Sequence, residues 1–163
     1  MNTSIIVKRV SFGLICLVAA GLGLWLSLAL RTDFKTIDER SYRWDQFSGH
    51  YLVVNYFAEW CAPCLKEIPE LNGFHDYANK QNDVSLFAVN FDNLDDNALK
   101  ELQSKYKMQF NMVSGLPLNA PYAMPKTLPA TFIIGRDGKL IKELKGEQTN
   151  QDLQLIIKQL RKL

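Results

Sequence analysis

The sequence has few of the side chains that hold metal ions, haem groups or a disulfide framework. Its 163 residues include only two histidines and three cysteines. A zinc site would have to combine Cys61, Cys64, His50 and His75, and their spacing fits no common structural site. A c-type haem attachment would need a histidine directly after Cys64, where Leu65 stands. We therefore expect no metal ion and no cofactor.

Excess charge of one sign is also lacking over most of the chain. All 17 acidic residues lie beyond residue 30, and so do all basic residues except Lys8 and Arg9. The part beyond residue 30 is therefore formally neutral, which gives no electrostatic reason to expect a nucleic acid as a partner. The sequence has no internal repeat and no low-complexity segment, so its length predicts one ordinary domain with a short appendage.

The appendage is a long apolar run, Val10–Leu30, without a charged residue. A helix rises about 1.5 Å per residue and crosses a hydrocarbon core of about 30 Å in roughly 20 residues, so this run is long enough to span a membrane. Lys8 and Arg9 precede the run, which places the N-terminus in the cytoplasm. We expect residues 1–31 to form a cytoplasmic tip and a single-pass transmembrane anchor in the inner (cytoplasmic) membrane. Residues 32–163 then form a periplasmic or otherwise extracytoplasmic domain.

A cleaved signal peptide stays open as an alternative, because Ser27-Leu28-Ala29 is a small-x-small cleavage site. The apolar run is longer than the usual signal-peptide core of about 7–15 residues, which favours an anchor. Cys16 lies within the run, and the preceding Leu14-Ile15 lacks the small residue expected before a lipidated cysteine. We interpret Cys16 as a small apolar residue of the helix. Export in either form implies an oxidising compartment.

Beyond the appendage, the hydrophobic patterns predict an α/β domain. Arg31–Gly49 is mixed and polar and is interpreted as a tether leading into the domain. Within it, Tyr42, Trp44 and Phe47 nearly alternate with polar residues, which is typical of a short edge strand or a turn packed on the core. Ser114–Pro129, with its four prolines, is interpreted as an irregular stretch. The first strands alternate with helices, which predicts parallel pairing, and Gly135–Gly138 predicts an antiparallel hairpin between the last two strands. The predicted strands are Tyr51–Ala58, Val84–Phe91, Thr131–Ile134 and Leu140–Leu144, and the predicted helices are Cys61–Lys80, Asp95–Lys107 and one that begins near Thr149.

Cys61 and Cys64 fall where a buried strand gives way to a helix. A helix N-terminus supplies free N–H groups and a partial positive charge, which favour the thiolate that attacks disulfides. Two intervening residues let Cys64 reach back and resolve a mixed disulfide formed at Cys61. Pro63 is tolerated in the first turn, because its missing N–H would have no partner within the helix. The pattern predicts a redox-active disulfide. An inert structural disulfide stays open, although so short a loop would add little stability.

Two motifs carry a resemblance to a known family. The first is Val53–Pro69 (VVNYFAEWCAPCLKEIP) and the second is Thr127–Gly138 (TLPATFIIGRDG). Together they resemble the thioredoxin superfamily, and more narrowly its membrane-anchored TlpA/ResA/CcmG-type thiol–disulfide oxidoreductases. The resemblance covers roughly Phe34 to the C-terminus. It implies a thioredoxin-like α/β fold, in which a central mixed sheet is flanked by helices and the cysteine helix faces a loop with a cis-proline.

The resemblance also implies roles for individual residues. Cys61 matches the exposed attacking cysteine, and Cys64 matches the buried resolving cysteine. Pro129 matches the cis-proline beside the disulfide, where the backbone of Leu128 can pair with an extended substrate. Trp60 matches the aromatic residue that precedes the active site. The substrate-binding residues expected from this match are Trp60, Pro63 and Leu128.

Two positions decide how the proton of Cys64 is handled. Where cytosolic thioredoxins have a buried aspartate, this chain has Asn55, and a neutral amide cannot take that proton. Glu67, three residues after Cys64 and on the same helical face, matches the glutamate of TlpA/ResA-like proteins. We interpret Glu67 as the substitute proton acceptor. The alternative is a solvated helix glutamate. If Glu67 is the acceptor, its loss should slow attack by Cys64 most severely at low pH, where thiolate is scarce.

For the function, the resemblance implies reduction of disulfides in exported proteins, such as apocytochrome c or a copper-site protein with paired cysteines. A transmembrane thiol carrier would supply the electrons. Two alternatives stay open. One is an oxidant that inserts disulfides, although the Ala62-Pro63 dipeptide lacks the histidine found between the cysteines of strong oxidants. The other is a non-catalytic assembly factor that uses the thioredoxin fold to hold a partner, against which the intact cysteine pair counts.

Overall fold

The computed structural model describes residues 17–25 and 31–162. The chain divides into two units, Met1–Thr32 and Asp33–Leu163. In the first unit, residues 17–25 are helical. The rest of the predicted transmembrane helix, Val10–Leu30, lies outside the described residues. Within the described ranges, no helix is both long enough and apolar enough to cross a bilayer.

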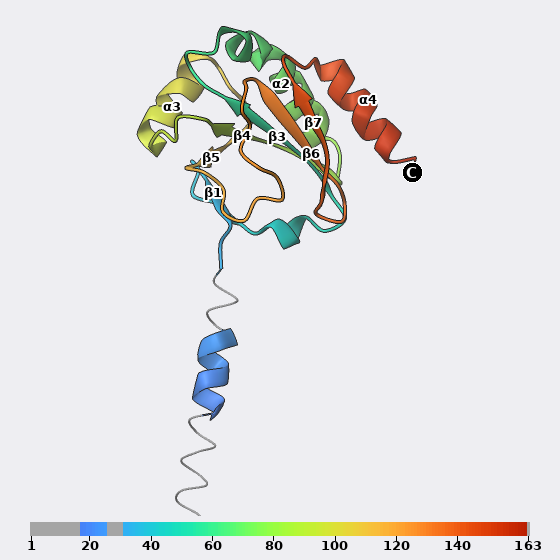
Figure 1. Ribbon diagram of the computed structural model, residues 1–163. Coiled ribbons are helices and arrows are strands. Elements are labelled where there is room, and N and C mark those ends of the chain that lie inside the picture. The colour runs from blue at the N-terminus through green and yellow to red at the C-terminus, as the bar shows by residue number, and fades with distance from the viewer. Residues whose placement is uncertain (1–16, 26–30, 163) are drawn as a thin grey trace, which may run out of the picture. The chain divides into compact units, whose positions relative to one another are not determined.

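The second unit is built on one seven-stranded sheet (Figure 1). Its order is β2-β1-β5-β4-β3-β6-β7, so the central strands β3 and β4 are flanked on both sides. The strands are β1 (Phe34–Thr36), β2 (Ser41–Tyr42), β3 (Tyr51–Phe57), β4 (Val84–Asn90), β5 (Asn111–Ser114), β6 (Ala130–Ile134) and β7 (Leu140–Lys145). The helices are η1 (Trp44–Phe47), α2 (Ala62–Asn79), α3 (Asp96–Lys105) and α4 (Asn150–Leu160).

The predicted pairing of the strands is confirmed. β3 and β4 are parallel, as are β4 and β5, whereas β6 pairs antiparallel with both β3 and β7. The β6–β7 hairpin turns at Gly135 and Gly138, where the Gly138 N–H donates to the Gly135 carbonyl over 2.9 Å. Gly138 has a φ of +76°, a left-handed conformation that glycine adopts without steric cost. The sheet is therefore mixed, as the thioredoxin-like resemblance implies.

The two faces of the sheet are covered differently. The buried apolar side chains of α2, α3 and α4 all belong to the hydrophobic cluster on one face. The cluster on the other face has no helical member among the described residues, apart from partly buried side chains of η1 packed against it. Tyr122 from the irregular stretch also covers it and stacks on Phe132 of β6, with ring centroids 4.3 Å apart. Every residue of β3 is buried, because both faces of this central strand are covered.

The segment Arg31–Gly49 is part of the domain and not a tether, which corrects the prediction. The edge strand or packed turn expected within it is confirmed, because β2 lies at the edge of the sheet and η1 packs against the core. Its β1 pairs with β5, where Lys35 lies opposite Ser114, and β2 pairs with β1. Phe34 is 4% exposed and contacts an aromatic group that spans this segment and β4. The members of this group are Phe34, Tyr42, Trp44, Phe47 and Phe87. This segment therefore belongs to the domain, as one edge of its sheet and a cover for one face.

Candidate active site

The cysteine pair lies at the first turn of α2, at the carboxyl end of the buried strand β3. Cys61 is the N-cap of the helix, and its Sγ accepts the Cys64 N–H over 3.3 Å. The two sulfurs are joined in a disulfide. Cys61 is 4% exposed and Cys64 1%, so the expected exposure of Cys61 is not seen in this oxidised state. The disulfide holds Cys61 against the helix and its hydrophobic cluster.

An exposed aromatic residue stands directly before the pair. Trp60 is 66% exposed, although its side chain is anchored at one end. Its Nε1–H donates to both carboxylate oxygens of Asp92, at 3.1 and 3.0 Å. Phe91 meets the indole edge-on, with ring centroids 6.3 Å apart. Pro63, in the first turn of α2, is also exposed. The disulfide is thus flanked by fixed apolar surface on which another polypeptide can pack.

The peptide bond between Leu128 and Pro129 is cis. Pro129 is buried, whereas Leu128 is half-buried and packs against both hydrophobic clusters. The carbonyl of Pro129 accepts the Gly146 N–H over 2.9 Å. This bond ties the start of β6 to the end of β7, and so fixes the loop from which β6 begins.

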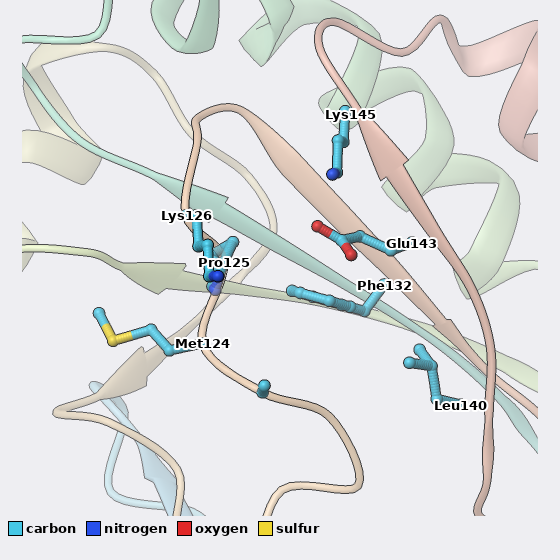
Figure 2. A pocket seen from close by; sticks show the side chains of 8 residues that line it. Met124, Pro125, Lys126, Phe132, Leu140, Glu143 and Lys145 are labelled. Atoms are coloured by element: carbon cyan, nitrogen blue, oxygen red, sulfur yellow. The ribbon is translucent and has the colours of Figure 1, made fainter.

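A hollow of about 330 Å³ lies beside this loop, on the face of the sheet that carries Phe132 (Figure 2). Residues 123–126 form one wall and β7 the other. Lys145 of β7 is the register partner of Ala130, the residue after Pro129. The lining residues are Ala123, Met124, Pro125, Lys126, Phe132, Leu140, Glu143 and Lys145. The surface next to the cis-proline therefore has a recess with both apolar and charged walls.

Glu67 is buried beneath the helix rather than solvated. It is 1% exposed, and both carboxylate oxygens accept hydrogen bonds. Oε1 accepts the Gln148 N–H over 2.8 Å, and Oε2 accepts the Asn55 Nδ2–H over 3.2 Å. Cys64 lies one helical turn earlier and is equally buried. The structure thus puts a carboxyl group and the sulfur of Cys64 on the same buried face of α2.

This environment raises the pKa of Glu67 to about 7. Burial is the main cause, because it disfavours the charged form. The Gln148 N–H and the Asn55 amide oppose the rise by donating to the carboxylate, and the nearby Glu147 carboxylate adds to it. A carboxyl group with this pKa exchanges its proton near neutral pH, which suits a proton acceptor or donor for a thiol.

The raised pKa makes the stability of the protein depend on pH. Between about pH 4.5 and pH 7 the folded state binds the Glu67 proton more tightly than the unfolded state, so stability falls as pH rises through this window. The loss is about 3 kcal/mol. We expect Glu67→Gln to remove this dependence. Urea unfolding at pH 5 and pH 8 measures the free energy of unfolding of both proteins. Relative to the wild type, the variant should be more stable at pH 8 than at pH 5. A constant difference across the two pH values would contradict the raised pKa.

Sequence reasoning missed two contributors to the site. Thr131, which is fully buried, accepts the Asn55 Nδ2–H over 3.0 Å, and Gln148 holds Glu67 through its backbone. Thr131 is in the second sequence motif, but only the register that places it opposite Asn55 reveals the contact. Gln148 donates through its backbone N–H, which almost any residue could supply. Its residue type therefore does not predict the contact. In the part of the chain that the structure describes, no group of three or more His, Cys, Asp or Glu side chains is placed to hold a metal ion.

These features define a thioredoxin-like domain with a disulfide-bonded cysteine pair at a helix N-terminus and a cis-proline before β6. Comparison with known proteins gives the family. The family model described as AhpC/TSA matches residues 28–143, and the chain belongs to this family.

Curated relatives match a comparable length of the chain. The thiol-disulfide oxidoreductase ResA of Bacillus thuringiensis subsp. konkukian is 33% identical over 116 residues, which are 70% of this chain and 65% of ResA. The sporulation thiol-disulfide oxidoreductase A of Bacillus subtilis is 28% identical over 109 residues, 64% of this chain and 65% of the relative. The chain thus spans slightly less than two thirds of the length of these relatives.

Solved structures agree on the fold. StoA from Bacillus subtilis superposes with a TM-score of 0.61 at 24% identity, covering 75% of this chain and 92% of StoA. A DsbF homologue from Corynebacterium diphtheriae gives a TM-score of 0.65 at 18% identity, covering 79% of this chain and 85% of the homologue. At these identities the likeness establishes the fold alone.

Proposed function

We propose that the chain is an extracytoplasmic thiol–disulfide oxidoreductase that reduces disulfides in exported client proteins. The observation that carries this proposal is the disulfide between Cys61 and Cys64 at the N-terminus of α2, above the buried carboxyl group of Glu67. A helix N-terminus stabilises the thiolate of the capping cysteine, and a buried carboxyl group can take the proton of the second cysteine. The names of the relatives, thiol-disulfide oxidoreductases, support the same activity.

The reaction balances with these residues alone and one external reductant. The Cys61 thiolate attacks one sulfur of a client disulfide, which forms a mixed disulfide and releases a client thiolate. Cys64 gives its proton to Glu67, and its thiolate attacks the Sγ of Cys61. The Cys61–Cys64 disulfide forms and the second client thiolate leaves, so two electrons have passed to the client. A membrane dithiol then reduces the Cys61–Cys64 disulfide and is itself oxidised.

The surface around the disulfide suits an extended client chain. Trp60 and Pro63 expose apolar surface beside Cys61, and Leu128 presents the backbone that precedes Pro129. The hollow lined by residues 123–126 and β7 leaves room for the client to continue past the loop (Figure 2). The proposed clients are exported proteins with a pair of cysteines in an extended segment, such as apocytochrome c or a copper-site protein.

Trapping the client tests this proposal directly. In Cys64→Ala, the mixed disulfide at Cys61 cannot be resolved, so we expect the client to stay attached through a bond that dithiothreitol releases. Non-reducing electrophoresis and mass spectrometry of the purified variant would identify it. The double variant Cys61→Ala/Cys64→Ala is the control and should trap nothing. If clients attached to Cys61 collect in the reduced form when the gene is deleted, the chain is an oxidant and the direction of the proposal is wrong.

The proposed location is the inner membrane, with the N-terminus in the cytoplasm and the domain outside it. This part of the proposal rests on the uncharged run Val10–Leu30 and on the two basic residues that precede it. The described part of the run, residues 17–25, is helical. An anchor would hold the active site at the membrane surface. There it could reach a transmembrane electron donor by diffusion in the plane of the membrane.

Fractionation tests the location. We expect protease added to spheroplasts to digest the domain, and alkaline carbonate to leave the chain in the membrane fraction. A cytoplasmic protein of similar size serves as the control for lysis. Release of a shortened, soluble chain that begins after Ala29 would show that the apolar run is a cleaved signal peptide instead.

A further inference from the structure

Asn55 joins two other buried polar side chains beneath the cysteine helix. Asn55 lies on β3, Glu67 on α2 and Thr131 on β6, and none is more than 1% exposed. Asn55 Nδ2 donates to Glu67 Oε2 over 3.2 Å and to Thr131 Oγ1 over 3.0 Å. Asn55 and Thr131 are direct partners in the antiparallel β3–β6 pair. One amide nitrogen therefore bridges the helix of the active site and the strand that follows Pro129.

The oxygen of the same amide has no partner. Asn55 Oδ1 is buried and accepts no hydrogen bond from any described residue. A buried acceptor without a donor is costly, and such groups are rare. Half a turn of the amide about its last torsion exchanges the nitrogen and the oxygen. The oxygen then lies within hydrogen-bonding reach of Glu67 Oε2 and Thr131 Oγ1, where it can accept two hydroxyl protons.

We propose that Asn55 is a positioning residue whose amide turns over when Glu67 gains or loses its proton. In the carboxylate form, Glu67 Oε2 accepts the Asn55 Nδ2–H, as in the structure. In the acid form, the Glu67 O–H donates to Asn55 Oδ1, and the hydroxyl of Thr131 donates to the same oxygen. The proton comes from Cys64 before Cys64 attacks the mixed disulfide, and it returns to the Cys64 thiolate when the disulfide is next reduced. This assignment of the proton rests on the proposed function.

The other groups that face Glu67 cannot replace the Asn55 amide as a hydrogen-bond partner of both the carboxylate and the acid. Oε1 is held by the Gln148 N–H, which can only donate. Among the described residues, Glu147 is the charged side chain that acts on Glu67, and at the surface it pairs with Lys66 over 3.1 Å. Cys64, one helical turn away, is the remaining titratable neighbour. Neither Gln148 nor Glu147 can both donate to the carboxylate and accept from the acid at Oε2, and in the oxidised protein Cys64 is held in the disulfide. An aspartate in place of Asn55 would add a second buried negative charge. A leucine could form a hydrogen bond with neither the carboxylate nor the acid form of Glu67.

The turn of the amide can be tested in the wild-type protein. The full chain in detergent micelles, oxidised so that neither cysteine titrates, is isotope-labelled and followed by NMR between about pH 5 and pH 9. Above the titration of Glu67, we expect a scalar coupling across the hydrogen bond from Asn55 Nδ2 to the Glu67 carboxyl carbon. Below it, we expect this coupling to vanish and the Asn55 amide signals to move with the Glu67 signal. A coupling that persists through the titration would overturn the proposal.

A pair of variants gives a second readout. We expect Asn55→Leu to raise the pKa of Glu67 by about one unit, a tenfold change in proton affinity. Both forms of Glu67 lose a partner, but the carboxylate loses more, because hydrogen bonds to ionised groups are roughly twice as strong. The matched control is Asn90→Leu, which removes another buried asparagine, 2% exposed, from the neighbouring strand β4. Equal shifts in the two variants would contradict the proposal.

These measurements need neither a client nor an electron donor, so they fail separately from the proposed function. A chain that reduces disulfides while its Asn55 amide stays fixed would reject this inference alone. A chain whose Asn55 amide turns with Glu67 but that reduces no disulfide would support the amide turn and reject the reductase.

Discussion

Replacement of Cys61 by serine is expected to abolish disulfide reduction, with a fall in rate of at least about a thousandfold. The serine hydroxyl fits the same N-cap position and can accept the Cys64 N–H that Cys61 Sγ accepts in the structure. It is not ionised near neutral pH, however, and an alcohol does not attack a disulfide. The loss should therefore be one of chemistry, with the fold kept.

The measurement is the turnover of a disulfide substrate under a constant supply of dithiol, with circular dichroism as the check on folding. Ala62→Ser is a matched control, because it adds a hydroxyl at the neighbouring exposed position of α2 and leaves both sulfurs in place. Full biological activity of Cys61→Ser in cells would contradict the enzyme and favour a non-catalytic assembly factor.

Replacement of Glu67 by glutamine is expected to slow the attack of Cys64 on the mixed disulfide by about a hundredfold near neutral pH. A carboxylate can accept the Cys64 proton, whereas an amide cannot. The pKa of Glu67, raised by burial to about 7, sets the pH range of the effect. At pH 5 the wild-type carboxyl group is mostly protonated and cannot act as a base, so the two rates should converge. The gap should open as pH rises through 7 and narrow again above about pH 9, where a free thiol ionises unaided.

Stopped-flow reduction of a disulfide substrate by both proteins across this pH range tests the expectation. Glu101→Gln on the exposed face of α3 is the matched control for the loss of one negative charge. Equal rates for wild type and Glu67→Gln at pH 7 to 8 would show that water, and not Glu67, accepts the Cys64 proton. The sequence alone predicts the largest effect at low pH. From the structure, we expect the largest effect of Glu67→Gln near neutral pH, because burial keeps Glu67 protonated under acidic conditions.

The sequence predicted the long elements of the domain, and of the short ones it indicated only an edge strand or packed turn in the region of β2 and η1. β3, β4 and the β6–β7 hairpin show apolar runs or turn residues that local patterns detect. β1 and β2 have three and two residues, too few to show a period. They exist because β5 offers a partner edge, and β5 itself lies before a proline-rich stretch and has only four residues. Pairing between distant segments, rather than local preference, forms these three strands.

The candidate site shows the same division. Cys61, Cys64 and Pro63 follow from one local motif, and the structure places them together at the start of α2. Glu67 follows from helical spacing, but its burial and raised pKa depend on the sheet beneath it. Asn55 was noted from sequence only as a group that cannot take a proton. Its bonds to Glu67 and Thr131 require the β3–β6 register, which the local pattern does not contain.

The two edge strands of the sheet bear on how the domain would bind the extended clients that we propose. A free strand edge is a template for pairing with another chain, and so for aggregation. One edge here is β2, which has only two residues, too few to template an extended partner. The other edge is β7, where Lys142, Glu143 and Lys145 are exposed. Charged side chains along an edge strand disfavour edge-to-edge association. We therefore expect the proposed clients to bind at the cysteine pair and not to be added to the sheet as a further strand.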